Sequence, residues 1–115
     1  MVTKVSMSEQ SYQLKDIINS LSRAKGLELF KSLREPKTWT ELENIAGGDK
    51  NSVNKRVSEF ITFNLVQPTL LDKTPKGSKG YVLTPLGLQV LEDLEKIEKA
   101  LEEQPEVEGR EVVFR

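Results

Sequence analysis

The N-terminal third of the chain has apolar residues at the spacing of an amphipathic helix. In the first segment they fall at positions i, i+3, i+4 and i+7, and these are Leu14, Ile17, Ile18 and Leu21. A second segment repeats the helical period with Leu27, Phe30 and Leu33. Ser6 and Glu9 precede the first segment with the spacing of a capping box. Ser20 and Ser22 could each cap a second helix, so the pattern predicts either one helix or two over residues 12–33.

A short helix is predicted next, over residues 41–46. Pro36 ends the preceding helix because proline cannot continue the backbone hydrogen bonds. Residues 38–40 can then form a short extended stub. Thr40 and Glu43 have the Thr-x-x-Glu spacing of a capping box, which predicts that the short helix starts after Thr40.

A glycine turn and a longer helix complete a helix-turn-helix. Gly47 and Gly48 form the turn, and either Asp49 or Asn51 can cap the next helix, which is expected to end near residue 63. Asn64 suits the left-handed conformation that commonly ends a helix. The apolar residues of this longer helix again follow the helical period, and they are Val53, Val57, Phe60 and Ile61.

Two runs that are typical of β-strands follow, at residues 65–72 and 81–84. They are joined by residues 73–80, a Pro/Gly/Lys loop that is too long for a two-residue hairpin turn. Pro68 has no amide hydrogen to donate to a neighbouring strand, so the first strand is expected at an edge of the sheet. The pattern predicts a hairpin with a basic loop.

A long helix closes the predicted fold. Thr84 is a good N-cap and Pro85 a good first helical residue, and the helix is expected to run to about Glu103. Leu91 widens an apolar stripe whose spacing of 4, 3 and 4 resembles a coiled-coil seam. The residues of that seam are Val90, Leu94, Ile97 and Leu101.

Composition narrows the possible functions. The chain has 115 residues, of which 37% are hydrophobic and 30% charged, so we expect one domain over residues 1–115. Its core is expected at about residues 12–101, and residues 104–115 form an acidic tail. There is no cysteine and no histidine, which excludes disulfides, thiolate nucleophiles and imidazole bases. We therefore expect no enzyme activity, no metal site and no cofactor.

The chain also lacks targeting and membrane signals. Residues 1–10 have no apolar stretch of signal-peptide length. No run approaches the roughly 18 apolar residues that a membrane span needs. These observations predict a cytoplasmic protein that does not associate with membranes.

Opposite charges are concentrated in different parts of the chain. Residues 1–90 contain 13 Lys/Arg and 9 Asp/Glu, whereas residues 91–115 contain 4 and 9, which together give the net charge of -1. Such asymmetry suggests a basic body that meets a polyanion and an acidic segment that faces away from it. A solvated Glu-rich helix explains the acidic part equally well.

The helix at residues 51–63 has a polar, cationic outward face. A helical wheel of about 100° per residue places Lys55 almost opposite the apolar side. Such a face could lie in a DNA major groove, although Lys55 and Glu59 could instead be a simple i,i+4 pair. Arg56 flanks the apolar side, where it suits a phosphate contact or a structural ion pair. The candidate DNA contacts of the helix are Asn51, Ser52, Asn54, Lys55, Arg56 and Ser58.

The loop between the predicted strands supplies a second set of candidates, which are Lys73, Lys76, Ser78 and Lys79. Lysines on a glycine-containing loop can reach phosphates while adding little sequence information. The loop has no arginine, the usual reader of the minor groove, which favours phosphate contact. Protection of a sheet edge by charge is the alternative explanation, and both can hold.

Several motifs together resemble winged helix-turn-helix regulators of the arsenic-repressor and multiple-antibiotic-resistance types. The stretch NSVNKRVSEFITFNLVQ resembles their recognition helix, with Ser52-Val53-Asn54-Lys55 at its start and Asn64-Leu65-Val66 at its end. Asn64 stands where these proteins usually have glycine. SRAKGLELFKSLREPKTWTELENIAG is similar to the segment before that helix, and YVLTPLG to the strand that returns from the wing. The resemblance covers roughly residues 12–101.

The resemblance implies a fold and a function. The fold would be mainly α with a small β-hairpin (α+β), a winged helix-turn-helix with an N-terminal helix and a long C-terminal dimerisation helix. The function would be sequence-specific binding of double-stranded DNA by a homodimeric, nucleoid-associated transcriptional regulator. Soft-metal sensing is not expected, because the Cys or His ligands of metal-sensing relatives are missing, and no small-molecule effector is indicated. The expected dimer surface consists of Leu14, Ile17, Ile18, Val90, Leu94, Ile97 and Leu101.

Two other functions fit the same residues. The winged helix could be a protein-protein interaction module in a larger assembly. Alternatively, the protein could bind DNA without sequence preference, as a nucleoid or plasmid-maintenance protein does. The modest charge of +4 in residues 1–90 argues against purely nonspecific binding, which depends on many phosphate contacts.

Overall fold

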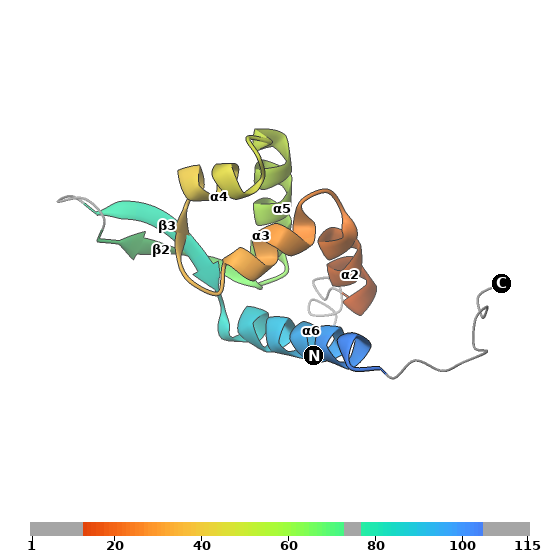
Figure 1. Ribbon diagram of the computed structural model, residues 1–115. Helices are drawn as coiled ribbons and strands as arrows, with labels where there is room; N and C mark the ends of the chain where they lie inside the picture. Colours follow the sequence, from red (N-terminus) through yellow and green to blue (C-terminus); the bar gives the residue numbers. More distant parts are fainter. Residues whose placement is uncertain (1–12, 73–76, 105–115) are drawn as a thin grey trace, which may run out of the picture.

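A helix-turn-helix, a β-hairpin and a long closing helix follow one another along the chain (Figure 1). The computed structural model describes residues 13–72 and 77–104. Its elements are α2 (Leu14–Ser22), α3 (Gly26–Ser32), β1 (Lys37–Thr38), α4 (Trp39–Ile45), α5 (Lys50–Thr62), β2 (Val66–Leu71), β3 (Ser78–Leu83) and α6 (Pro85–Glu102). The predicted capping box at Ser6 and Glu9 lies outside these residues, as does most of the predicted tail.

The predicted N-terminal helical region is two helices, but neither serine caps the second one. The N-cap of α3 is Lys25, whose φ of 63° places it in the left-handed region. Ser20 lies inside α2 and bonds to α5, while the Ser22 hydroxyl donates to Asn19 O at 2.9 Å. The turn is tight because Gly26 packs against the end of α2, where a Cβ would lie 2.4 Å from Ser20 O.

Helix α4 begins two residues earlier than predicted. Thr38, not Thr40, is its N-cap, and its hydroxyl accepts from Glu41 N at 3.2 Å. The Glu41 carboxylate accepts in return from Thr38 N at 2.9 Å, which completes the capping box. Both Thr-x-x-Glu pairs were available in the sequence, and the pairing of Thr38 with β3 decides where the strand ends and the helix begins.

The predicted turn and the end of α5 are confirmed. Gly47 and Gly48 have φ values of 68° and 88°, and the helix that follows runs from Lys50 to Thr62. Asn64 has a φ of 62°, the left-handed conformation expected of it. Leu65 N donates to Phe60 O at 2.8 Å, so the chain turns directly from α5 into β2.

The hairpin is confirmed and gains a third strand. Strands β2 and β3 pair antiparallel from Val66 with Leu83 to Leu71 with Ser78. The stub predicted at residues 38–40 is β1 at Lys37–Thr38, because residues 39 and 40 belong to α4. It pairs with the other side of β3, so the strand order is β1-β3-β2. Strand β2 therefore lies at an edge, as Pro68 predicts. β3 begins at Ser78, three residues earlier than predicted, which shortens the loop.

The core lies where the helices meet the sheet. The rings of Phe30 and Phe60 pack edge to face, with centroids 5.2 Å apart, and join α3 to α5. Trp39 packs against the edge of this core, with its ring 5.9 Å from that of Tyr81. The other fully buried large side chains are Leu29, Leu33, Leu42, Leu65, Leu91, Val53 and Val57. The core therefore fixes α5 and the sheet relative to each other.

Helix α6 enters the core only through its first turns. Thr84 caps it, as predicted, and Gly87 lies so close to Leu65 that a Cβ would be 2.0 Å from Leu65 O. Leu91 is fully buried, so it belongs to the core and does not widen the seam. Farther along, Ile97 and Leu101 are exposed. None of the helices in the described part of the chain is long and apolar enough to cross a membrane.

Candidate nucleic-acid interface

The start of α5 is set by Asp49. Its carboxylate accepts from Ser52 N at 3.0 Å and from the Ser52 hydroxyl at 2.7 Å. These hydrogen bonds stabilise the charged form and lower the pKa of Asp49 below its ordinary value. Of the two caps that the sequence allowed, the structure therefore uses Asp49. This leaves the side chain of Asn51 exposed on the first turn.

Four of the predicted DNA contacts are exposed along α5, and together we call them the polar face of α5: Asn51, Asn54, Lys55 and Ser58. Ser52 is half-buried, and its hydroxyl donates to Asp49. The buried residues of the same helix include Val53, Val57 and Phe60, which point into the core. The apolar period of the sequence therefore predicted the outward side of α5, except that Ile61, which was expected on the buried side, is 39% exposed.

Arg56 is a correction to the predicted contacts. Its residue exposure is only 5%, and its Nε lies 3.2 Å from Glu59 Oε1. A guanidinium so buried would have to leave this partner to reach a phosphate, which would cost its desolvated ion pair. The alternative of a structural ion pair is the one observed. Glu59 also faces Arg23 at 3.4 Å, so the carboxylate that could have paired with Lys55 is paired elsewhere.

The predicted wing residues are split between strand and loop. Ser78 and Lys79 belong to β3, and Lys73 and Lys76 lie outside the described residues. Lys79 is exposed, and its Nζ lies 5.7 Å from the centre of the Tyr81 ring. That distance allows a cation-π contact, which would hold the ammonium near the outer surface of the sheet.

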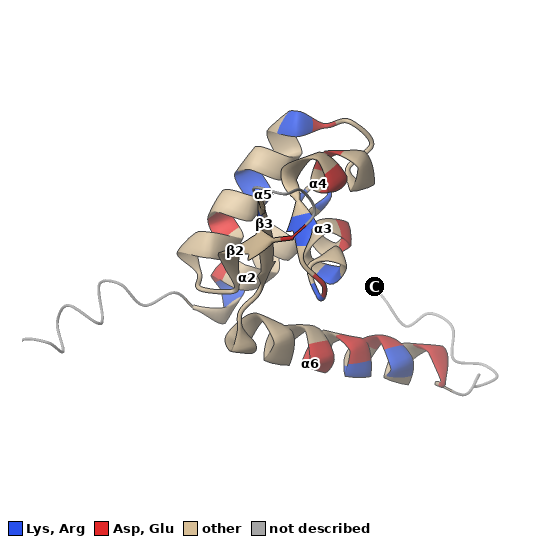
Figure 2. Cartoon of the chain, turned by 90° about the vertical axis from the view of Figure 1, so that its left-hand side faces the viewer, with Lys and Arg blue, Asp and Glu red and all other residues tan. Residues whose placement is uncertain are grey.

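One exposed cation near the polar face is absent from the predicted contacts. Lys50 is the first residue of α5 and is exposed. The sequence pattern places it in the turn, although its position directly after the cap Asp49 is the signal that could have found it. Figure 2 shows the α4–α5 turn at the end of the molecule farthest from α6, and Lys50 directly follows this turn as the first residue of α5.

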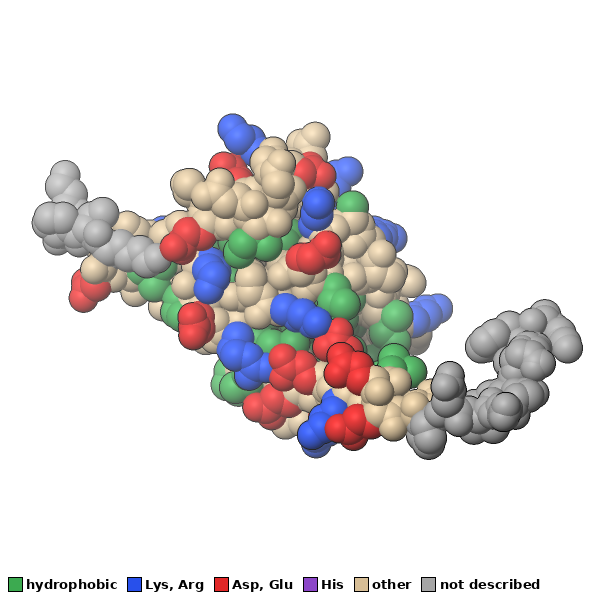
Figure 3. Space-filling model, viewed as in Figure 1, with side chains coloured by type: hydrophobic (Ala, Val, Ile, Leu, Met, Phe, Trp, Pro, Cys, Tyr) green, Lys and Arg blue, Asp and Glu red, His purple; other side chains and the backbone are tan. Residues whose placement is uncertain are grey.

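Helix α6 lies on the opposite side from the α4–α5 turn (Figure 2), and it carries two lysines and five acidic residues. Two of the acidic residues pair with α3 and the residues that follow it: Lys31 Nζ lies 2.7 Å from Glu98, and Arg34 pairs with Glu95. The Glu95 hydrogen bond raises the pKa of Arg34. In Figure 3 red and blue side chains accordingly lie side by side over α6. The excess of acidic residues late in the sequence is thus carried by α6, although Glu41, Glu43 and Asp49 place carboxylates near the α4–α5 turn as well.

The predicted dimerisation residues meet in one apolar groove. It lies between α2 and α6, has a volume of about 220 Å³, and includes every predicted residue except Leu101. Leu14 is 70% exposed, Ile97 57% and Leu101 66%, whereas Leu94 is half-buried against the core. The lining residues are Leu14, Ile17, Ile18, Leu21, Val90, Asp93, Leu94 and Ile97.

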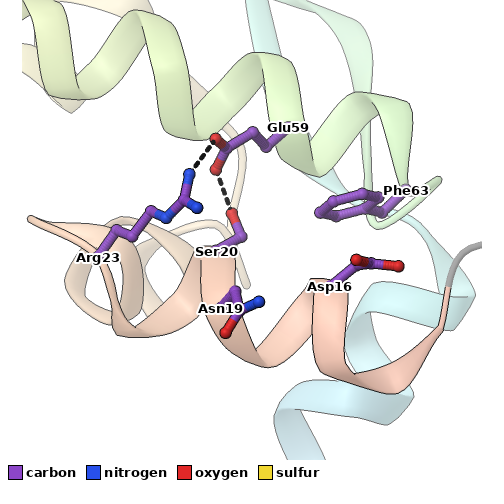
Figure 4. Close-up of a pocket in the computed structure, with 6 residues that line it drawn as sticks. All are labelled: Asp16, Asn19, Ser20, Arg23, Glu59 and Phe63. Carbon is purple, nitrogen blue, oxygen red and sulfur yellow. Dashed lines mark hydrogen bonds and ion pairs between the residues drawn. The ribbon is translucent and has the colours of Figure 1, made fainter.

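A polar cavity of about 130 Å³ lies on the other side of α2, facing α5 (Figure 4). Its lining includes the Glu59 carboxylate and the Ser20 hydroxyl, which donates a hydrogen bond to that carboxylate. The other lining residues are Asp16, Asn19, Arg23 and Phe63. The sequence pattern does not predict this hydrogen bond, because its partners are 39 positions apart.

Comparison with known proteins identifies the fold. No protein-family model matches the sequence, and no curated protein sequence does either. Among solved structures, the reduced form of the transcriptional regulator YodB from B. subtilis matches with a TM-score of 0.65 and 17% identity, over 81% of this chain and 92% of that one. NolR from Sinorhizobium fredii matches with a TM-score of 0.57 and 18% identity, over 83% and 90%.

A MarR-family regulator from Enterococcus faecalis V583 is also similar. Its TM-score is 0.59 at 24% identity, over 79% of this chain and 87% of that one. Identities this low establish a shared architecture and not a shared activity. The element order, the three-stranded sheet and these similarities lead to one conclusion: this chain has the winged helix-turn-helix fold found in MarR-family transcriptional regulators.

Proposed function

We propose that this protein binds double-stranded DNA in a sequence-specific manner, as a homodimeric transcriptional regulator. The observation that carries the proposal is the polar face of α5, which is exposed on the second helix of the helix-turn-helix. The similar structures are described as transcriptional regulators, which supports the same class of function. An enzyme is not proposed, since cysteine and histidine are missing from this chain.

The polar face of α5 suits the major groove. A groove about 12 Å wide admits an α-helix, whose N-terminal residues contact the base edges. Asn51 and Asn54 carry amides that can pair with adenine, and Lys55 can donate to the acceptors of guanine. Their side chains are short or flexible and extend from the half of α5 that lies away from α2. Lys50 at the first turn is suited to a phosphate.

The hairpin would contribute contacts to the backbone. Lys79 is exposed on β3, and Lys73 and Lys76 belong to the connection between β2 and β3. Lysine is a flexible point charge, which favours phosphates over base edges. The acidic α6 lies on the opposite side from the α4–α5 turn, so it would not repel the bound polyanion.

The groove between α2 and α6 is the proposed dimer surface. Leu14 and Ile97 line the groove and expose more than half of their surface, as does Leu101 about one helical turn beyond Ile97. Burying such apolar area against a second copy would be favourable, by about 25 cal/mol per Å² removed from water. A two-fold axis there would relate two copies of α5, which a palindromic site requires.

Genomic footprinting followed by binding titrations tests the proposal. Footprinting should give discrete palindromic sites, which then serve as the specific DNA. Lys55→Ala should weaken the free energy of binding to that site by about 1–3 kcal/mol, as expected when a base-edge hydrogen bond is removed. Binding to scrambled DNA should change little. Lys96→Ala is the matched control, because it removes the same charge from the exposed side of α6.

The other outcomes favour the other functions. Equal weakening of both DNAs by Lys55→Ala would mean that Lys55 acts as a charged grip, which favours a nucleoid role. No DNA binding by the unmodified protein would reject the proposal and favour a protein-protein interaction module.

A further inference from the structure

One carboxylate, that of Glu59, joins α5 to α2. Ser20 on α2 donates its hydroxyl hydrogen to Glu59 Oε1 on α5, as Figure 4 shows. Arg23 Nη1, which directly follows α2, lies 3.4 Å from Oε2. From within α5, Arg56 Nη2 donates to Oε2 at 3.3 Å. Three side chains from two segments of the chain thus converge on Glu59.

This contact is shielded from water on the side of Ser20 and Arg56, whereas the Arg23 side chain is 58% exposed. Ser20 is 2% exposed and Arg56 is 5% exposed, and the side chain of Glu59 is 26% exposed. Hydrogen bonds to a charged group are stronger than neutral ones, and removing water strengthens them further. Arg56 Nε lies 3.2 Å from Oε1 but lacks the alignment of a hydrogen bond. The carboxylate therefore stays fixed mainly through Ser20 and Arg56 Nη2.

The other contacts of α5 do not determine its rotation equally well. They are mostly apolar, such as the packing of Phe60 on Phe30 and the burial of Val57. Apolar burial depends on area and has little directional preference. A hydrogen bond to a carboxylate does depend on direction. Glu59 follows Lys55 by about one helical turn, so its direction is coupled to that of the polar face.

We propose that Glu59 is a positioning residue, whose bond to Ser20 fixes the rotation of α5 and hence the direction in which Asn51, Lys55 and Ser58 project. This inference rests on the proposed function. Because α2 also lines the apolar groove, the same bond connects the proposed dimer surface to the polar face. A change in how α2 packs against its partner would therefore reach α5 through this bond.

The test compares two serines on α2. Ser20→Ala removes the bond to α5 and leaves every charge in place. Ser22→Ala is the matched control, since its hydroxyl bonds to Asn19 O within the same helix. Each variant is titrated on the footprinted site and on scrambled DNA, with thermal unfolding and sedimentation as checks on folding and assembly.

Ser20→Ala should weaken binding to the specific site roughly tenfold, as expected when a base contact is misaligned. Binding to scrambled DNA should stay almost unchanged. Nonspecific binding depends on phosphate charge, which this variant does not alter. Ser22→Ala should behave as the unmodified protein on both DNAs. If Ser20→Ala binds both DNAs as Ser22→Ala does, or weakens binding to both equally, the positioning role is rejected. Either result would leave the proposed function unaffected.

A second pair of variants keeps the test decisive if Ser20→Ala does not fold. Glu59→Gln retains an acceptor for Ser20 and Glu59→Ala does not, while both leave Arg56 without its anionic partner. Glu59→Gln should discriminate between the two DNAs better than Glu59→Ala, and equal discrimination would reject the inference. If the unmodified protein binds neither DNA, the proposed function fails and the inference fails with it.

Discussion

Two glycines constrain the backbone of this protein for different reasons. They are Gly87 and Gly48. Gly87 lies where a Cβ would be 2.0 Å from Leu65 O, so the limit is space. Gly48 has a φ of 88°, and a Cβ there would meet no neighbouring group within 4 Å, so the limit is conformation. The two glycines therefore represent two kinds of constraint on the backbone, one of space and one of conformation.

Gly87→Ala should destabilise the fold more than Gly48→Ala. We expect the free energy of unfolding to fall by about 3 kcal/mol for Gly87→Ala, because the Leu65 carbonyl and the first turn of α6 must move apart. Gly48→Ala should cost about 1 kcal/mol, the usual penalty for a side chain in a left-handed conformation. Urea unfolding of both variants measures the difference. Equal losses would mean that α6 can shift away from Leu65 at little cost.

At the scale of elements, the hairpin and α5 are expected to contact different parts of DNA. The polar face of α5 carries amides and a hydroxyl beside Lys55, whereas the hairpin contributes lysines. Base-edge contacts and phosphate contacts respond differently to salt, because each phosphate neutralised releases condensed counterions. The two elements can therefore be distinguished by the salt dependence of binding alone.

Replacing Lys76 and Lys79 by Ala should weaken binding to specific and scrambled DNA alike. The log-log salt dependence should become shallower by about one unit for each phosphate that the variant no longer neutralises. Titrations at several salt concentrations measure that slope. The double variant Lys96→Ala/Lys99→Ala removes two exposed charges from α6 and serves as the control, which should leave the slope unchanged. A loss confined to the specific site would indicate that the hairpin reads sequence.

At the scale of the whole molecule, the apolar groove between α2 and α6 is the feature that bears on assembly. The groove is formed within one chain, but Leu14 and Ile97, which line it, are exposed, and so is Leu101 farther along α6. Leu94 is half-buried against the core, so substitutions there would disturb the monomer as well as any dimer. Ile97, at 57% exposure, is the better position for testing assembly alone.

Ile97→Glu should produce monomers that remain folded. A charge at this position would be buried without a partner in the dimer but would stay in water in the monomer. Sedimentation at micromolar concentration measures the change, and Leu70→Glu is the control, since Leu70 is 75% exposed on the hairpin. The unmodified protein should sediment as a dimer and bind half-sites about one helical turn apart. A monomeric unmodified protein would contradict the proposed assembly.

The sequence by itself determined the order of the elements and which side of α5 faces the core. Its apolar periods identified the helices, because a helix buries residues that recur every three to four positions whatever it packs against. Local chemistry identified the proline at the edge strand, the left-handed Asn64 and the cap at Thr84, since each depends on neighbours in the chain. These predictions needed no information about distant contacts.

Tertiary structure decided what depends on residues far apart in the chain. Two capping boxes overlapped at residues 38–43, and the pairing of Thr38 with β3 selected the first. The sequence left Arg56 available for DNA. In the folded protein Arg56 is paired with Glu59, which also accepts a hydrogen bond from Ser20 on α2. The sequence predicted that Leu91 widens the apolar seam of α6. In the structure Gly87 packs closely against Leu65, and Leu91 is buried in the core. In each case the sequence offered two acceptable local states, and packing between distant segments favoured one of them.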